Sequence, residues 1–537
     1  MKWRSVILWL AGIVLVNVLV HFAVVRYDMT DDKRYSLSPQ TKQLLRGTQE
    51  PIIVVNYLDG ELNAGFTRLK KAVEETVEEM AVYGDIRRLA PNDEDIKESG
   101  LQPTVIHERA QNGRTAQTAV YPYVEVRCGN HRTFAALLKN NRGLSGEENL
   151  NHSIEGIEYA LAEAIHGLTN KDTARVAFIE GHGELPERYV MDLTTQLARF
   201  MWVDRGVLGN SVDDLLPYKA LIIADPQKAF SEKDKFLLDQ YLMRGGRILW
   251  VMNGVQFSQD VLSSEGFTPA IPLDLNLNDM LFRYGVRISP ALIQDVQCLP
   301  VPVDVSSNAA EPNYQPLPWY YAPLLLTSQV SPITRNVMQV SSMFCSPVEV
   351  VGGEDGIRKE ILLATSTASR MIPTPAKVDL GDLNPDMEEF RWQYIPVGIL
   401  LEGTFASAFA HRMVPEGIDE QTPIQKTSVP TRQIVIASGS VIRNEIRQGQ
   451  MLPMGYDRYS GMQFGNRDMM VNAVLYLCDD EGLMSLRQRE LTLRLLNDKR
   501  AHERRQVIQA VSISVPILLL AMVVAIVMVI RKKRYTR

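Results

Sequence analysis

"KALIIADPQKAFSEKDKFLLDQYLMRGGRILWVMNG", residues 219–254, contains a strand, a helix and a second strand in immediate succession. The run "KALIIADP" is short, apolar and ended by a proline, which is typical of a buried strand. Ser231 suits a helix cap with Asp234 as its partner, and Gly245 and Gly246 end the helix before the strand "RILWVM". Two buried strands joined by a helix predict a parallel sheet.

The same pattern extends on both sides of this stretch and predicts one α/β domain over residues 171–480. The strand "ARVAFIE" (174–180) precedes the helix "YVMDLTTQLARFM" (189–201), and two later runs could add strands: "GILLEGTFASAF" (398–409) and "RQIVIASGS" (432–440). The spacing predicts a doubly wound, Rossmann-like parallel sheet, of the kind also found in glutamine amidotransferases. Proline-rich stretches at 299–323 and 370–395 are expected to be long loops.

A smaller α/β domain is predicted over residues 26–170. Ser38-Pro39 opens a first helix, "PIIVVNYLDG" (51–60) reads as a buried strand, and residues 66–84 read as an amphipathic helix. A hairpin around a Gly-Asn turn and a helical stripe over residues 148–169 complete the domain.

Both ends of the chain carry an apolar stretch long enough to cross a bilayer. These are Val6–Val25 and Val507–Ile530, and Pro516 falls early in the second one. The basic tail 531–537 predicts a cytoplasmic end, and two spans place the tip 1–5 on the same side. The domains 26–170 and 171–480 then lie outside the cytoplasm, and 481–506 form a basic stalk helix before the second span.

Composition and motifs exclude several classes of protein. The net charge of −6 gives no support for nucleic-acid binding. No P-loop motif, no G-x-S-x-G elbow and no closely spaced histidine pair occurs, so neither a cofactor nor a metal site is predicted. Four cysteines without a C-x-x-C pair leave both disulfides and buried free thiols open.

One turn carries the candidate site. In "FIEGHGELPE", residues 178–187, His182 and Glu184 follow a strand and are framed by glycines. Asp225 follows the next buried strand. Ligands of doubly wound sheets bind where the strands end, so His182, Glu184 and Asp225 are candidate ligand-binding residues. No nucleophile accompanies His182, and no catalytic residue is predicted; a structural turn is the favoured interpretation.

Several stretches together resemble one family. They are "RYDMTDDKRYSLSPQT", "SIEGIEYALAEAI", "FIEGHGELPE", "KDKFLLDQYLMRGGRILWVMNG", "LNDMLFRYGVRI" with "QDVQC", and "NRDMMVNAVLYLCDD". The set is similar to the gliding-motility-associated ABC transporter auxiliary proteins of Bacteroidetes, the GldG type, which are often labelled substrate-binding. Many relatives carry aspartates in the turn where this chain has Ser438 and Ser440, so any acidic or metal role of that turn is in doubt.

The resemblance implies an inner-membrane protein with a large periplasmic part. Its implied partners are a multi-span ABC permease and, through it, a cytoplasmic ABC ATPase, with a periplasmic cargo or envelope protein as a further partner. The expected function is a non-enzymatic transporter subunit linked to gliding or secretion. The alternatives are a hydrolase on an amidotransferase-like sheet that uses His182 and Glu184, and a purely structural scaffold.

Overall fold

The computed structural model describes most of the chain between residues 36 and 535. The described residues are 36–48, 50–60, 62–91, 101, 103–109, 115–129, 131–138, 146–169, 174–304, 314–335, 337, 339–352, 356–382, 385–418, 423–447, 449–480, 482 and 505–535. The predicted tip 1–5, the predicted span 6–25 and nearly all of the predicted stalk helix lie outside them. The chain divides into two compact units, Met1–Arg489 and Glu490–Arg537.

The first unit begins with a small α/β domain around a four-stranded sheet of order β2-β1-β5-β6. Its strands are β1 (Ile52–Asn56), β2 (Ile86–Leu89), β5 (Tyr123–Cys128) and β6 (His131–Ala136), with a separate hairpin of β3 (Thr104–Arg109) and β4 (Thr115–Val120). Its helices are α2 (Pro39–Gly47), α3 (Ala64–Met80), α5 (Gly146–Glu155) and α6 (Ile157–Thr169). The helix predicted over residues 148–169 is therefore two helices, which meet at Gly156.

One apolar core joins this sheet to its helices. Leu69, Val73 and Val77 of α3 pack with Leu161 of α6 and with Val54 of β1. Ser38 caps α2 as the sequence predicts, since its hydroxyl accepts a hydrogen bond from the Thr41 amide at 3.1 Å.

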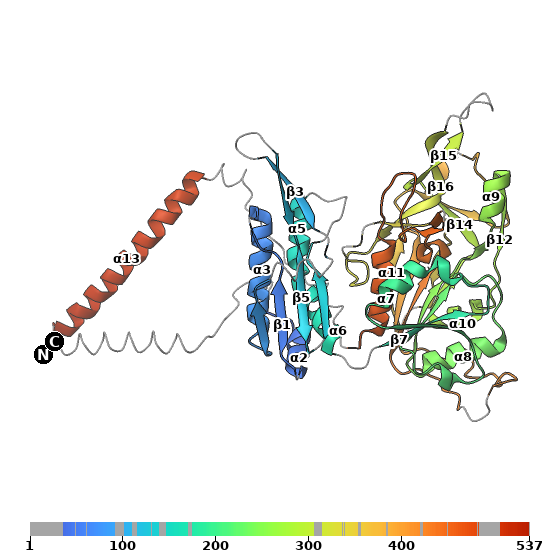
Figure 1. The fold of residues 1–537 in the computed structure, drawn as a ribbon, viewed down its shortest axis with the longest axis horizontal. Coiled ribbons are helices and arrows are strands. Elements are labelled where there is room, and N and C mark those ends of the chain that lie inside the picture. Colours follow the sequence, from blue (N-terminus) through green and yellow to red (C-terminus); the bar gives the residue numbers. More distant parts are fainter. Residues whose placement is uncertain are drawn as a thin grey trace. The chain divides into compact units, whose positions relative to one another are not determined.

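A large ten-stranded sheet is the centre of the following domain in the first unit (Figure 1). Its path is β15-β16-β19-β22-β23-β10-β9-β7-β8, with β17 paired to β16. The strands on this path are β7 (Arg175–Glu180), β8 (Trp202–Val207), β9 (Ala220–Ala224), β10 (Arg247–Val251), β15 (Cys298–Asp304), β16 (Tyr314–Thr327), β19 (Arg358–Ala364), β22 (Pro396–Gly403) and β23 (Thr431–Ile436). Five of them, β8, β7, β9, β10 and β23, run parallel.

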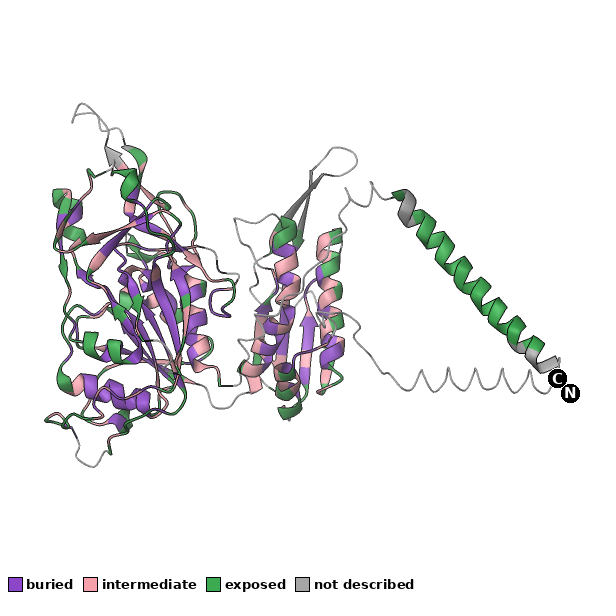
Figure 2. Ribbon diagram, turned by 180° about the vertical axis from the view of Figure 1, so that it is seen from behind, coloured by how far each residue is buried: buried purple, intermediate pink, exposed green. Residues whose placement is uncertain are grey.

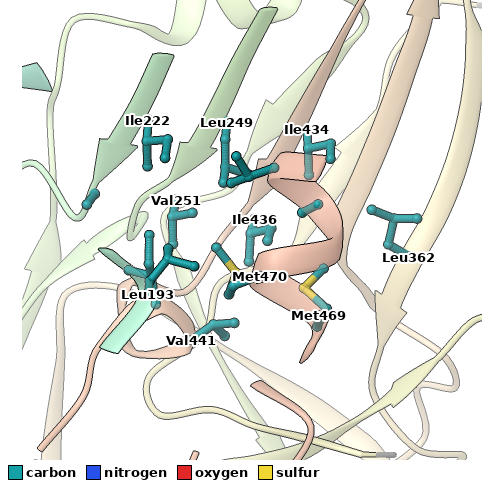
Figure 3. Close-up of a cluster of buried hydrophobic side chains, with 14 of the residues drawn as sticks. Leu193, Ile222, Leu249, Val251, Leu362, Ile434, Ile436, Val441, Met469 and Met470 are labelled. Atoms are coloured by element: carbon teal, nitrogen blue, oxygen red, sulfur yellow. The ribbon is translucent and has the colours of Figure 1, made fainter. Parts of the chain in front are cut away.

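Helices cover both faces of the parallel strands. On one face, α7 (Met191–Leu197) and α11 (Asn466–Cys478) pack on alternate strand residues such as Ile222, Leu249 and Ile434 (Figure 3). On the other face, α8 (Glu232–Met243) and α10 (Asn278–Tyr284) cover the intervening residues. Alternation of buried residues on two faces is what a strand covered on both sides requires. Figure 2 shows the central strands β9, β10 and β23 as mostly buried, whereas β8 at the edge of the sheet is partly exposed.

The sheet is mixed, so the prediction of a parallel sheet holds for only part of it. β22 runs antiparallel to β23 and to β19, and β16 runs antiparallel to β15 and β19. A parallel connection needs a crossover, usually a helix, and no α-helix lies in residues 404–418 and 423–430, the described part of the β22–β23 link. The apolar run at 398–409 correctly indicated a strand. Such a run does not show whether the strand is parallel or antiparallel to its neighbours.

The two segments expected to be proline-rich loops contain strands instead. β15 and β16 occupy much of 299–323, and β20 (Ser369–Pro373) with β21 (Ala376–Asp379) occupies part of 370–395. In the first pair Pro300 stands opposite Pro318, and Pro302 stands opposite Pro316. In an antiparallel pair, hydrogen-bonded and non-hydrogen-bonded positions alternate, so prolines two residues apart occupy the same kind of position. At non-hydrogen-bonded positions the pair needs no amide proton, and the pairing therefore tolerates these prolines.

Short elements fill the long connection between β10 and β23 and the segment after β23. The strands are β11 (Val255–Gln256), β12 (Phe267–Pro272), β13 (Val286–Ile288), β14 (Ala291–Asp295), β17 (Val340–Ser341), β18 (Val348–Val350), β24 (Ile446–Arg447) and β25 (Gln450–Met451). The remaining helix there is α9 (Gln259–Glu265).

The second unit contains the helix α13 (Arg505–Tyr535) with Pro516 inside it. Within it, Gln509–Val529 is long and apolar enough to cross a membrane, and among the described residues it is the one helix that is. All its side chains are exposed, as Figure 2 shows. A long helix that is apolar all round and buried against nothing fits the predicted second span.

Candidate functional site

The five parallel strands create a point where successive connections diverge. Their spatial order is β8-β7-β9-β10-β23, so β7 lies between the two strands that follow it in the chain. The helix after β7, α7, covers one face, and the helix after β9, α8, covers the other. The turns that leave β7 and β9 therefore separate at the carboxyl edge, where the parallel strands end, and such a point is the usual ligand position in doubly wound folds.

The GHGE turn, residues 181–184, follows β7 and folds back on itself. Gly181 and Gly183 have φ angles of 118° and 77°, a region that glycine adopts without steric cost. The Glu184 carboxylate accepts a hydrogen bond from the His182 amide at 2.7 Å, and it lies 3.1 Å from the imidazole Nδ1. The carboxylate therefore closes the turn by contacting both the backbone and the ring of His182.

The second nitrogen of His182 is also occupied. Nε2 lies 3.2 Å from the carboxylate of Asp234, at the start of α8, and the ring stacks on Phe230 with centroids 3.7 Å apart. Asp234 is the cap partner that the sequence indicates: its amide donates to the Ser231 hydroxyl at 3.1 Å. His182 is buried, and both ring nitrogens contact carboxylates.

These contacts set the charge of the ring. Burial alone lowers the pKa of His182, but the hydrogen bonds to Glu184 and Asp234 and the charges of both carboxylates outweigh it, so the pKa is raised. The two carboxylates therefore favour the protonated ring, and through its contacts with them the ring joins β7 to α8. A general base needs a free nitrogen, and His182 has none here, so the contacts around it describe a structural brace.

Backbone hydrogen bonds tie the GHGE turn to the turn after β9. The carbonyl of His182 accepts from the amides of Gln227 and Lys228, both at 2.8 Å, and the Leu185 amide donates to the Ala224 carbonyl at 2.9 Å. His182 and Glu184 are thus brought together, and the Asp225 turn is held beside them.

Asp225 contacts a different set of residues. Its carboxylate accepts from the Asn253 amide nitrogen at 2.7 Å and from Gln227 at 3.0 Å. Asn253 follows β10, and its side-chain oxygen accepts from the Gly439 amide, after β23, at 2.9 Å. The ends of three adjacent parallel strands, β9, β10 and β23, are therefore joined through Asp225 and Asn253.

Asp225 is strained and its charge is poorly compensated. Its φ of 55° is rare for a residue with a side chain. Burial raises the pKa of this carboxyl to about 7, although the charge of Arg443 and the Gln227 hydrogen bond act in the opposite direction. A titratable group shifted in this way at the carboxyl edge is typical of functional sites, and also of some structural networks.

Two serines, Ser438 and Ser440, occupy the turn after β23. The hydroxyls of Ser438 and Ser440 lie 2.9 Å apart, and the Ser440 hydroxyl accepts from the Met343 amide at 2.8 Å. They hold the segment around Met343 against the sheet. Among the described residues, no group of three His, Cys, Asp or Glu side chains is arranged to hold a metal ion.

Asn253 and Arg443 were not among the candidate residues predicted from the sequence. The available signal was their position: each lies just beyond a predicted strand of the same sheet, as Asp225 does. Of the two alternatives for the cysteines, the free thiols are found. Burial raises the pKa of Cys345 and of Cys478 to about 12, so both are neutral and poorly nucleophilic thiols at neutral pH.

The fold and the site define a class of protein: an α/β body with a braced sheet edge, followed by a helix able to cross a membrane. Residues 173–473 match the family model described as an ABC-type uncharacterized transport system. This match covers more than half of the 537 residues, and the chain belongs to that family. The protein is thus an auxiliary component of an ABC-type transport system. This confirms the general role that the resemblance implied.

Other comparisons add little. Residues 31–127 match a model described as a domain of unknown function. No curated protein matches the sequence. Among solved structures, the N-terminal domain of mmIFT52 is similar with 15% identity and a TM-score of 0.33, over 57% of this chain and 97% of that chain.

Proposed function

We propose that the protein is a non-enzymatic, membrane-anchored subunit that docks on the permease of an ABC transporter. The observation that carries this proposal is the apolar helix Gln509–Val529, fully exposed in a chain of an ABC transport family. An exposed apolar surface of this length is stable only in lipid or against another membrane helix. The permease, and through it the ATPase, are the partners that the family supplies.

The proposed layout follows the two apolar stretches of the sequence. Residues 6–25 and 507–530 span the inner membrane, and the tips 1–5 and 531–537 are cytoplasmic. The α/β domains 26–170 and 171–480, with the stalk 481–506, lie in the periplasm. There they bind cargo or an envelope protein, in a complex of the GldG type linked to gliding motility or secretion.

The contacts of His182 favour this reading over the hydrolase. Both ring nitrogens contact carboxylates, and the Glu184 carboxylate is bound to the His182 amide. An activated water would have to displace one of these contacts before proton transfer. A ligand-binding role of His182, Glu184 and Asp225 remains part of the proposal; of the three, Asp225 has the strained and uncompensated environment that supports it.

Purification of the tagged full-length protein from membranes in mild detergent tests the docking. We expect the permease and the ATPase to co-purify in fixed ratio. A matched control exchanges residues 509–529 for an unrelated single-span helix, which keeps the anchor and removes the specific contacts. Recovery of the wild-type protein alone, or equal recovery of partners with the exchanged helix, would show that this helix does not dock on a permease.

Protease added to intact spheroplasts tests the layout. We expect cleavage within residues 26–480 and protection of the C-terminal tail. Protection of the body together with cleavage of the tail would invert the layout and rule out a periplasmic binding role.

A further inference from the structure

Two arginines from different turns of the carboxyl edge lie around one tyrosine ring. Arg188 belongs to the short turn Glu187–Tyr189 that follows the GHGE turn, and Arg443 follows β23. The guanidinium carbons of Arg188 and Arg443 lie 4.8 Å and 4.4 Å from the centroid of the Tyr189 ring. Residues more than 250 positions apart thus bring two cations to one place.

Hydrogen bonds fix this arrangement. The Asn444 amide donates to the Tyr189 carbonyl at 2.8 Å, and the Asn444 side chain donates to the Arg188 carbonyl at 3.0 Å. Asn444 is buried, whereas Arg188 is exposed and Arg443 is half-buried. The backbone that carries the two arginines is therefore rigidly joined, and the charged ends of their side chains remain accessible to solutes.

A third cation stands on the neighbouring turn. Lys228 follows β9 and is exposed, and its amide is bound to the His182 carbonyl. Its Cγ lies 3.6 Å from the position that a Cβ on Gly183 would take, so its stem passes along the GHGE turn. We call Arg188, Lys228 and Arg443 the cation cluster; all three come from turns beside the point where the connections of β7 and β9 diverge.

The cation cluster has no carboxylate partner within ion-pair distance in the described part of the chain. Other arginines of this domain do have one: Arg205 pairs with Glu180, and Arg467 pairs with Asp192. The exposed neighbours Glu187 and Glu445 pair with neither Arg188 nor Arg443. The charge of Asp225 acts on Arg443 only from beyond ion-pair distance, and burial keeps much of that carboxyl neutral near pH 7, with a pKa of about 7.

We propose that the cation cluster binds an oxyanion, the phosphate or carboxylate group of a small molecule, with Arg188 and Arg443 as the principal donors. A guanidinium presents parallel N–H groups that match both kinds of oxyanion. Both guanidinium groups lie close to one tyrosine ring. Positive charge without a partner in a fixed arrangement attracts such groups. The carboxyl edge is also where doubly wound sheets bind ligands. The inference goes beyond the proposed membrane role and does not depend on it.

Titration calorimetry of the full-length protein in non-ionic detergent tests the site, with inorganic phosphate and acetate as probes at constant ionic strength. We expect saturable binding of at least one probe. The Arg443→Gln and Arg188→Gln variants should each weaken it about tenfold or more, because each removes a charged donor. The Asp225→Asn variant should tighten it, because the competing carboxylate is gone. Tighter phosphate binding would assign a phosphate group, and tighter acetate binding a carboxylate.

Arg458 provides a matched control, since it also lies over an adjacent tyrosine, 4.6 Å from the Tyr459 centroid, without an ion pair in the described chain. Arg458→Gln should leave binding unchanged. If Arg443→Gln proves poorly folded by circular dichroism, Arg443→Lys keeps the charge without the fork and should bind with intermediate affinity. Absence of saturable binding of both probes to the wild type, or equal affinity of the wild type and the Arg443 variants, would overturn the proposal. Failure here leaves co-purification with a permease untouched, so the two proposals fail separately.

Discussion

The turn after β7 and the turn after β9 lie side by side at one sheet edge, and each carries an acid: the Glu184 side chain is buried and Asp225 is half-buried. At the GHGE turn, Glu184 and Asp234 of α8 both contact the ring of His182, and together they favour its protonated form. In the next turn, Asp225 adopts a rare backbone conformation and receives neutral amides from Asn253 and Gln227. The first turn uses its carboxylates to build the structure, whereas the second keeps a costly one, so Asp225 has the stronger case for a functional role.

The largest effect is expected where the Asp225 turn meets β23. A Cβ on Gly439 would lie 2.2 Å from the Asp225 carboxyl, inside the sheet edge, so Gly439→Ala should lower the free energy of unfolding by ~3 kcal/mol. Thermal unfolding of the detergent-solubilised protein measures this. Gly206→Ala is the control, since nothing lies within 4 Å of its added Cβ. Asp225→Gly should restore most of the loss in the double variant; an additive double variant would mean that the two residues do not meet.

Removal of the His182 ring tests its role in the GHGE turn. His182→Ala leaves the buried Glu184 and the half-buried Asp234 without their partner, and we expect a loss of about 2 kcal/mol of stability in chemical unfolding. The exposed His411 gives the control variant His411→Ala, which should cost almost nothing.

The same ring predicts a pH dependence. Because the pKa of His182 is raised in the folded state, its contribution is fully present below the ordinary value of 6.5 and is lost as the pH rises through the raised value. The difference in stability between the wild type and His182→Gln should therefore shrink from pH 6 to pH 9. A difference that stays constant over this range would mean that the ring is neutral and the brace is not ionic.

Substitution of Asp225 should have the opposite effect, because we expect it to increase the stability of the protein. Its raised pKa, about 7, means that the folded state holds the proton more tightly than the unfolded state. Its stabilising contribution is present below pH 3.8 and is lost as the pH rises to 7. Asp225→Asn keeps the acceptor for Asn253 and suits the positive φ, so we expect a gain of up to about 2 kcal/mol at pH 8 that shrinks towards pH 5. The exposed Glu265→Gln is the control; a loss of stability at pH 8 would show that the Asp225 charge is well compensated.

Sequence patterns predicted the helices and strands, but not which residues at their ends come into contact. Apolar runs and the Ser231 cap gave β7, β9, β10 and α8 because burial and capping are local properties. The direction of β22 depends on a connection without a helix, which the run itself does not encode. Likewise Asp234 was recognisable as a cap partner, but its contact with His182, 52 residues away, follows from the order of the strands. The candidate residues could be predicted one by one from the sequence. Their grouping in space could not: His182 contacts Glu184 and Asp234, whereas Asp225 contacts Asn253.

The smallest effect concerns the serines that border the Asp225 turn. The Ser440 hydroxyl accepts from the Met343 amide, and Ser440→Ala leaves that amide without its acceptor, so we expect a loss of about 1 kcal/mol. Ser440→Asp places a second carboxylate in this turn. The new carboxylate can replace the acceptor, but it would stand near Asp225, so its cost should exceed that of alanine at pH 8 and fall as Asp225 is protonated towards pH 5. If the loss of stability caused by Ser440→Asp does not change with pH, the serine turn does not interact electrostatically with Asp225. The effect of the Asp225 charge is then limited to the turn after β9.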